Sequence, residues 1–228
     1  MVTLHVPCVA DSAPRKPSRP GRINSRCLPL DAFLVLYAGR LDREKGIEVL
    51  IDAYESLGLP PDGGCLVMAG APRNHREPEA GHAYAASLRA RTDSRSCLWL
   101  GWVPDTKALY RAADVTVLPS LTDEPFARVT LEAMASECPV LVSAVGGSPE
   151  ALTGEFTRYL IPPGDSEALA TALAGLRDWR QRCPGLGMAC RDHVRLNFPL
   201  ERAVERIEAS LMQVVDARAT THQASNVH

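Results

Sequence analysis

The sequence predicts an α/β fold in which a parallel sheet of about six strands is covered by helices on both faces. Three observations support this prediction. Short, continuous apolar runs alternate with segments in which apolar residues recur at helical spacing. Glycine and polar residues directly follow the apolar runs, as expected where buried strands end at one edge of a sheet. The composition, 46% hydrophobic and 23% charged over 228 residues, is that of an ordinary globular protein.

The strands are predicted from apolar runs that have the length of a buried strand, such as FLVLYAG and CLVMAG. Residues 1–30 come before the first run and are rich in proline, arginine and serine, so we expect an interdomain linker there. The predicted strands cover residues 33–39, 65–70, 97–103, 114–120, 139–144 and 158–162.

The helices are predicted from apolar residues that recur every three or four positions, and the first of them ends at Gly58 and Pro60. The predicted helices cover residues 46–58, 82–92, 105–113, 127–137, 166–182, 187–198 and 200–217. We therefore expect one domain over residues 31–199, a terminal helix over 200–217 and a disordered tail over 218–228.

Charge, hydropathy and motifs argue against several classes of function. The formal net charge of -2 is unlike that of a general nucleic-acid binder. No apolar run approaches the ~18 residues of a membrane span, and we expect no secretory signal. The G-x-G-x-x-G, P-loop and Cys/His zinc patterns are all missing from the sequence. The seven cysteines form no C-x-x-C pair and are predicted to be buried, reduced thiols of a cytoplasmic protein.

A basic pair follows the first predicted strand, in the segment AGRLDREKG. Arg40 can hold two phosphate oxygens in a bidentate manner, and Lys45 can act as a point charge. Together they could neutralise a diphosphate without a metal ion. The alternative is a solvated, charged turn that also contains Asp42, Arg43 and Glu44.

Two carboxylates, Glu124 and Glu132, stand in an E-x7-E spacing around the start of a predicted helix. The free N–H groups of a helix N-terminus suit a phosphate, and carboxylates beside it can accept hydrogen bonds from sugar hydroxyls. This combination suits a nucleotide-sugar. Taken singly, Glu132 could be a surface helix residue, and Glu124 a loop acid that interacts with the helix dipole.

The strings AGRLDREKG, EPFARVTLEAMA and PVLVS together resemble the signature of the retaining, group 1 glycosyltransferases of GT-B fold. The resemblance runs from about Val6 to Val215 and matches the carboxyl-terminal, Rossmann-like half of those enzymes. It implies that the chain binds a nucleoside-diphosphate sugar, which is transferred with retention of anomeric configuration and without a metal cofactor. It also implies an amino-terminal acceptor domain on a separate or longer chain, and a cytoplasmic protein, in some members peripheral to the membrane.

The same resemblance implies roles for individual residues. Arg40, Lys45 and Glu124 are expected to serve catalysis by contacting the diphosphate and the transferred sugar, and Glu132 is expected to bind the ribose. The other implied donor contacts are Gly39, Val103, Phe126, Ala127, Arg128 and Val129. Asp105 and Lys107 either lie near the nucleobase or belong to a plain turn between strand and helix, in which Asp105 caps the helix.

Two residues depart from the family pattern, since Ala127 and Glu137 stand where glycine is usual. If Glu137 must adopt a left-handed conformation, it costs roughly 1 kcal/mol.

Two other functions stay open: a non-catalytic nucleotide-sugar-binding or interaction subunit, and a nucleotide-sugar epimerase or hydrolase on the same fold.

Overall fold

The computed structural model describes residues 32–60, 62–72, 78–122, 124–125 and 128–225. The linker predicted over residues 1–30 lies outside these ranges, as do Phe126 and Ala127. The chain divides into two compact units, of which the first ends at Arg191 and the second begins at Asp192. The division therefore falls inside a helix rather than at 199, where the sequence places the end of the domain.

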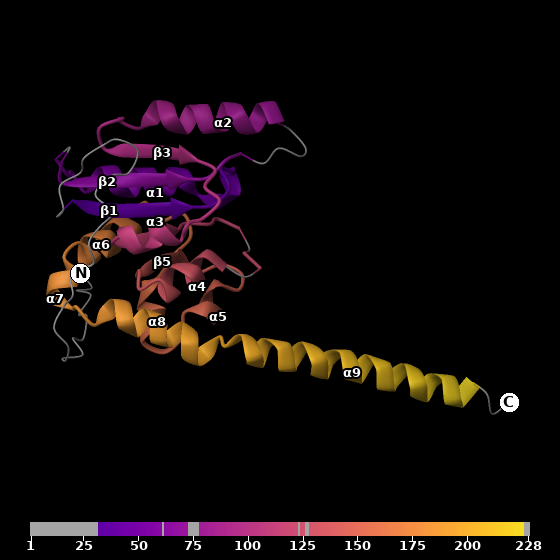
Figure 1. The fold of residues 1–228 in the computed structure, drawn as a ribbon. Coiled ribbons are helices and arrows are strands. Elements are labelled where there is room, and N and C mark those ends of the chain that lie inside the picture. The colour runs from indigo at the N-terminus through magenta and orange to yellow at the C-terminus, as the bar shows by residue number, and fades with distance from the viewer. Residues whose placement is uncertain (1–31, 61, 73–77, 123, 126–127, 226–228) are drawn as a thin grey trace. The chain divides into compact units, whose positions relative to one another are not determined.

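The first unit is built on one sheet of six parallel strands in the order β3-β2-β1-β4-β5-β6 (Figure 1). The strands are β1 (Phe33–Ala38), β2 (Gly64–Ala69), β3 (Cys97–Gly101), β4 (Val115–Leu118), β5 (Val140–Ser143) and β6 (Leu160–Ile161). All neighbouring strands pair in parallel, and β1 pairs with β2 along its whole length. The predicted fold class is confirmed. The strand order reverses between β1 and β4, where such sheets bind their ligands.

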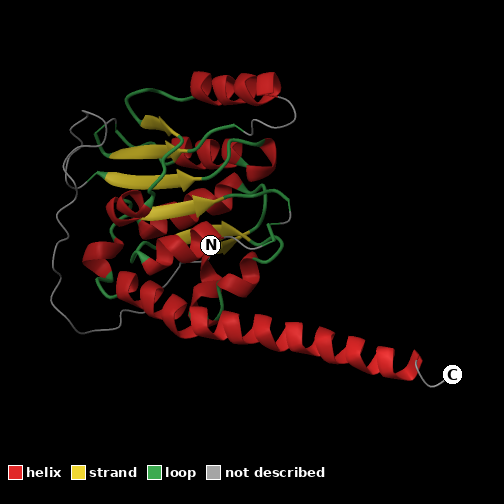
Figure 2. Ribbon diagram, turned by 45° about the vertical axis from the view of Figure 1, so that its right-hand side comes forward, coloured by secondary structure: helices red, strands yellow, loops and turns green. Residues whose placement is uncertain are grey.

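Helices lie on both sides of the strands (Figure 2). They are α1 (Ile47–Ser56), α2 (Pro78–Arg91), α3 (Lys107–Ala112), α4 (Arg128–Ala135), α5 (Ser148–Ala151), α6 (Ser166–Leu176), α7 (Trp179–Arg182) and α8 (Leu186–Asn197), with 3-10 helices η1 (Arg43–Lys45) and η2 (Gly154–Tyr159). In the layers that cover the sheet, α1 packs against α6, and α3 packs against α4. The β1 and β2 strands are buried along their whole length, which explains their continuous apolar sequences.

The single helix predicted over residues 166–182 is wrong, because the chain turns between α6 and α7. The buried Trp179 side chain donates its Nε1–H to the carbonyl oxygen of Asp114 at 2.8 Å. Arg180 Nε donates to the Asp114 carboxylate at 2.9 Å, and the same carboxylate accepts the Leu34 amide at 2.8 Å. These contacts tie α7 to the start of β4. Tertiary contacts therefore override a helical periodicity that continues through the turn.

The second unit contains α9 (Leu200–Ser225). This helix starts where the sequence predicts but runs past residue 217, so the tail predicted as disordered is helical as far as Ser225. Its length exceeds the prediction because no proline or glycine interrupts the segment after residue 217. Among the helices of the described ranges, none combines the length and the apolar character needed to cross a membrane.

The thiols in the described ranges agree with the prediction for cysteine. Cys65, Cys97, Cys138, Cys183 and Cys190 are buried, as predicted. Burial raises the pKa of Cys97 and of Cys138 to about 12, so both thiols stay protonated at neutral pH.

Glu137, which stands where the family pattern usually has glycine, has a left-handed backbone conformation with φ of 65°. The Cys138 amide donates to the Ala133 carbonyl at 3.0 Å, and the Glu137 amide donates to the Met134 carbonyl at 3.0 Å. This is the Schellman pattern, in which glycine is the preferred residue at the position of Glu137. The side chain forms a surface ion pair with Arg191, which contributes little.

We expect Glu137→Gly to raise the free energy of unfolding by about 1 kcal/mol, because glycine relieves the left-handed strain. The matched control is Glu137→Ala, which removes the same ion pair but keeps the strained backbone, and it should not stabilise the protein. Urea unfolding of the three proteins measures both changes. Equal stability of the glycine and alanine variants would contradict the expectation.

Candidate functional site

A cleft of about 750 Å³ opens where β1, β2 and β4 end, at the point where the strand order reverses. The cleft brings together, from positions far apart in the sequence, most of the residues predicted to form the site. Its lining includes Gly39, Arg40, Lys45, Val103, Glu124, Arg128, Val129 and Glu132. Phe126 and Ala127 lie outside the described residues. The location of the cleft is that of ligand sites in open α/β sheets.

Two close backbone contacts hold the loops after β1 and β4 together. The Leu121 amide donates to the Glu44 carbonyl at 2.8 Å. Gly46 has φ of 61°, and a Cβ atom at this position would overlap the carbonyl oxygen of Pro119. Only glycine accepts both the left-handed backbone and this close approach. Gly46 therefore sets the distance between the two loops that carry Lys45 and Glu124.

Glycines also line the cleft, where the loops after β1 and β2 meet. The Gly39 amide donates to the Ala69 carbonyl at 2.9 Å. A Cβ atom on Gly70 would overlap the carbonyl oxygen of Gly39. The two backbones touch directly, which leaves the space above them open to the cleft.

Lys45 and Glu124 form an ion pair across the strand-order reversal, between Lys45 Nζ and Glu124 Oε2. Each side chain is 18% exposed, so the pair is only partly screened by water. Ser120 Oγ donates to the same carboxylate oxygen at 3.3 Å. A phosphate that binds Lys45 would therefore compete with or add to the contact with Glu124.

The loop that carries Glu124 is supported from below by the glycines after β5. The Gly147 amide donates to the Glu124 carbonyl at 2.8 Å. A Cβ atom on Gly146 would overlap the same Glu124 carbonyl oxygen. Gly146 and Gly147 do not line the cleft themselves, but they position the backbone of Glu124.

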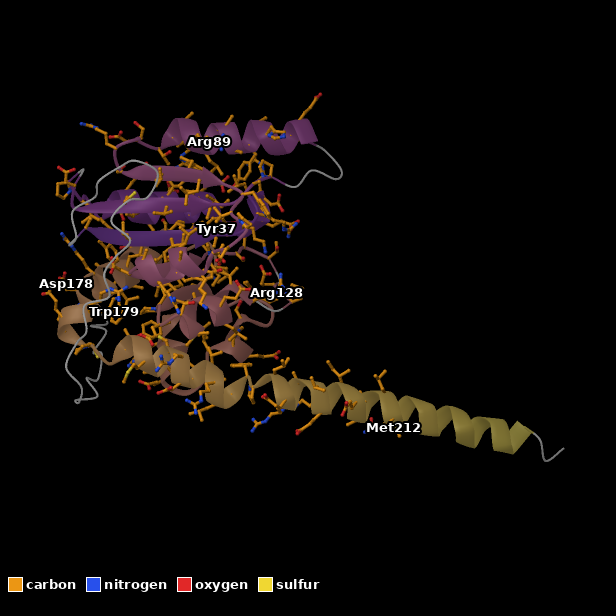
Figure 3. All side chains as sticks on the ribbon, viewed as in Figure 1. Tyr37, Arg89, Arg128, Asp178, Trp179 and Met212 are labelled. Atoms are coloured by element: carbon orange, nitrogen blue, oxygen red, sulfur yellow. The ribbon has the colours of Figure 1, made fainter. Side chains whose placement is uncertain are left out.

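Arg40 lies at the mouth of the cleft, with its side chain 40% exposed. Its Nη1 is 2.9 Å from Asp42 Oδ2, and its carbonyl oxygen accepts the hydroxyl of the buried Tyr37. The charged turn considered from the sequence is therefore present, and Arg40 belongs both to this turn and to the cleft. Figure 3 labels Tyr37, which belongs to β1, and Arg128. Arg128 lies at the side of the sheet toward which the strand arrows of Figure 1 point.

The chain matches the sequence model of a family described as "Glycosyl transferases group 1" over residues 23–181, more than half of its length. The chain belongs to the group 1 glycosyltransferases. A curated relative, the D-inositol 3-phosphate glycosyltransferase of Corynebacterium aurimucosum, is 34% identical over 186 residues. That alignment covers 79% of this chain and 43% of the relative.

Two solved structures share the fold of this group 1 glycosyltransferase chain. Sucrose-phosphate synthase of Thermosynechococcus elongatus superposes with a TM-score of 0.71 at 32% identity, over 83% of this chain and 47% of the synthase. Anabaena HepE, solved in complex with UDP-glucose, gives a TM-score of 0.69 at 24% identity, over 80% of this chain and 49% of HepE. The chain thus spans less than half the length of these relatives and matches one Rossmann-like half of a GT-B fold.

Sequence reasoning missed several side chains that line the cleft of this glycosyltransferase chain. They include Tyr110, Ser120 and Trp102, of which Trp102 is 74% exposed. Tyr110 donates from its hydroxyl to Glu132 Oε2 at 3.0 Å. Trp102 and Ser120 could have been found from their positions in loops that follow strands, whereas Tyr110 lies within α3 and carries no such signal.

The residue left undecided beside the predicted base site, Asp105, serves the local turn. Its Oδ1 accepts the Lys107 amide at 3.0 Å, and neither Asp105 nor Lys107 lines the cleft. Thr106 lines it instead. Within the described ranges, no group of three or more His, Cys, Asp or Glu side chains is arranged to hold a metal ion.

Proposed function

We propose that this chain is the donor-binding half of a retaining glycosyltransferase that moves a sugar from a nucleoside-diphosphate sugar to an acceptor. One observation carries the proposal. A single cleft at the strand-order reversal holds two cations, Arg40 and Lys45, together with two carboxylates, Glu124 and Glu132. Cations suit a diphosphate, and carboxylates suit the hydroxyls of the sugar and the ribose.

In this proposal Lys45 and Arg40 stabilise the negative charge that develops on the departing nucleoside diphosphate. Lys45 is held in place by Glu124, so it needs little reorganisation when charge develops. Two fixed cations can balance much of the charge of a diphosphate, and the proposal therefore needs no metal cofactor.

Glu124 would accept hydrogen bonds from the transferred sugar, Glu132 would bind the ribose, and Val103 would border the nucleobase. Glu124 is already engaged by Lys45 and Ser120, which makes its carboxylate a weak covalent nucleophile. We therefore propose that retention arises from attack on the face that the diphosphate leaves, with the leaving phosphate assisting deprotonation of the acceptor hydroxyl.

The acceptor would be held by another domain, on a longer or separate chain. The relatives are more than twice as long as the aligned segment, which supports this part of the proposal. Apolar side chains on α9 also support it, because Leu200, Ile207 and Leu211 are each more than 60% exposed. The buried thiols fit a cytoplasmic location, and any contact with a membrane would belong to the acceptor domain.

Calorimetric titration of the chain with UDP, GDP and ADP tests the donor site. We expect saturable binding of one of the three diphosphates and about tenfold weaker binding by Arg40→Ala, because one charge-assisted contact is lost.

The matched control is Arg95→Ala, which removes an arginine of the turn before β3 whose side chain is 71% exposed and lies outside the cleft. This variant should bind like the wild type. No binding of any diphosphate by the wild type, or equal losses in both variants, would refute the proposal.

A further inference from the structure

A buried tyrosine donates a hydrogen bond to the carboxylate to which the proposed function assigns the ribose. Tyr110, on α3, is 2% exposed, and its hydroxyl donates to Oε2 of Glu132 on α4 at 3.0 Å. The two residues both line the cleft. A carboxylate that is held at one oxygen presents its other oxygen in a defined direction, whereas an unheld glutamate samples several rotamers.

The hydroxyl of Tyr110 stays protonated. Burial raises the pKa of Tyr110 to about 12, so the phenol remains a donor at neutral pH. The hydrogen bond therefore runs from the Tyr110 hydroxyl to the Glu132 carboxylate.

The hydrogen bond between Tyr110 and Glu132 joins two helices that border the cleft. Tyr110 lies on α3, which begins soon after Val103, the residue assigned to the nucleobase, and Glu132 belongs to the helix assigned to the ribose. A nucleoside has its base and its ribose hydroxyls at a fixed separation, so a rigid link between the two contacts would favour a ribonucleoside.

We infer that Tyr110 is a positioning residue, which orients Glu132 toward the ribose hydroxyls of the donor and makes the site prefer ribonucleoside over dideoxyribonucleoside diphosphates. The inference rests on the proposed function. It differs from a purely structural role of the α3–α4 contact, because a structural role would affect all diphosphates equally.

The test compares the diphosphate that binds among UDP, GDP and ADP with its 2′,3′-dideoxy analogue, by calorimetry. We expect Tyr110→Phe to weaken binding of the ribonucleotide about tenfold, the usual effect of losing a hydrogen bond to a charged group, and to leave binding of the dideoxy analogue unchanged. In the background of Glu132→Gln, the Tyr110→Phe change should have little further effect on either ligand.

Tyr84→Phe is the matched control. The Tyr84 hydroxyl also donates to a glutamate, Glu48, but this pair joins α2 to α1 and lies outside the cleft. The control should bind both ligands like the wild type, and thermal unfolding confirms that each variant is folded.

The outcomes separate the inference from the function on which it rests. Absence of diphosphate binding by the wild type would refute both. Binding by the wild type, together with a Tyr110→Phe effect that is absent or equal for the two ligands, would refute the positioning role alone.

Discussion

Lys45→Ala is expected to weaken binding of the nucleoside diphosphate about 100-fold, the upper range for a hydrogen bond to a charged group. Lys45 is more enclosed than Arg40, since its side chain is 18% exposed compared with 40%. Its removal also leaves the partly buried Glu124 carboxylate without its cation, and this uncompensated negative charge would repel the phosphates. Calorimetric titration with the diphosphate measures the loss.

Lys107→Ala provides the control for this prediction. Lys107 is exposed at the start of α3, and its side chain is absent from the lining of the cleft. The same change of charge should therefore alter binding less than about twofold at physiological salt. If the two lysine variants lost affinity equally, the effect would come from the net charge of the protein, and the role given to Lys45 would be wrong.

Gly46→Ala is expected to lower the free energy of unfolding by about 3 kcal/mol and to abolish diphosphate binding at 25 °C. The new methyl group would face both a left-handed backbone and the Pro119 carbonyl oxygen. The first costs about 1 kcal/mol and the second about 2 kcal/mol, since overpacking against backbone forces the chain to shift. The shift would separate the loops that bring Lys45 to Glu124.

Gly58→Ala isolates the two contributions. Gly58 lies just beyond the other end of α1 and has φ of 59°, but no atom lies within 4 Å of a Cβ built there. The Gly58→Ala variant should lose only about 1 kcal/mol of unfolding free energy, the cost of the left-handed backbone, and should bind the diphosphate like the wild type. Urea unfolding and titration of both variants decide the matter, and equal losses of stability would show that the approach of Gly46 to Pro119 is unimportant.

The sheet could be predicted from the sequence because its strands are buried on both faces and therefore read as continuous apolar runs. FLVLYAG and CLVMAG are the plainest cases, and both are strands in the structure. The turn between α6 and α7 could not be predicted. It depends on hydrogen bonds from Trp179 and Arg180 to Asp114, and the local sequence of the helix does not indicate contacts with a residue so distant in the sequence.

The site could be predicted only in part, for a similar reason. Arg40 follows a predicted strand and Val103 is the last residue of another, so the edge on which they meet follows from the topology of a parallel sheet. The partners of these residues do not follow. Tyr110 looks like an ordinary apolar residue of a helix, and its hydrogen bond to Glu132 exists because α3 and α4 lie side by side.

The reversal of strand order also divides the sheet into two halves that share a narrow seam. Only two residue pairs give the register between β1 and β4, Val35 with Val115 and Leu36 with Thr116. Arg40 and Lys45 lie on the β1 side of this seam, whereas Glu124 and Glu132 lie on the β4 side. A nucleotide-sugar that contacts all four side chains would act as a clasp across the seam, so that part of its binding energy would serve to hold the two halves of the sheet together.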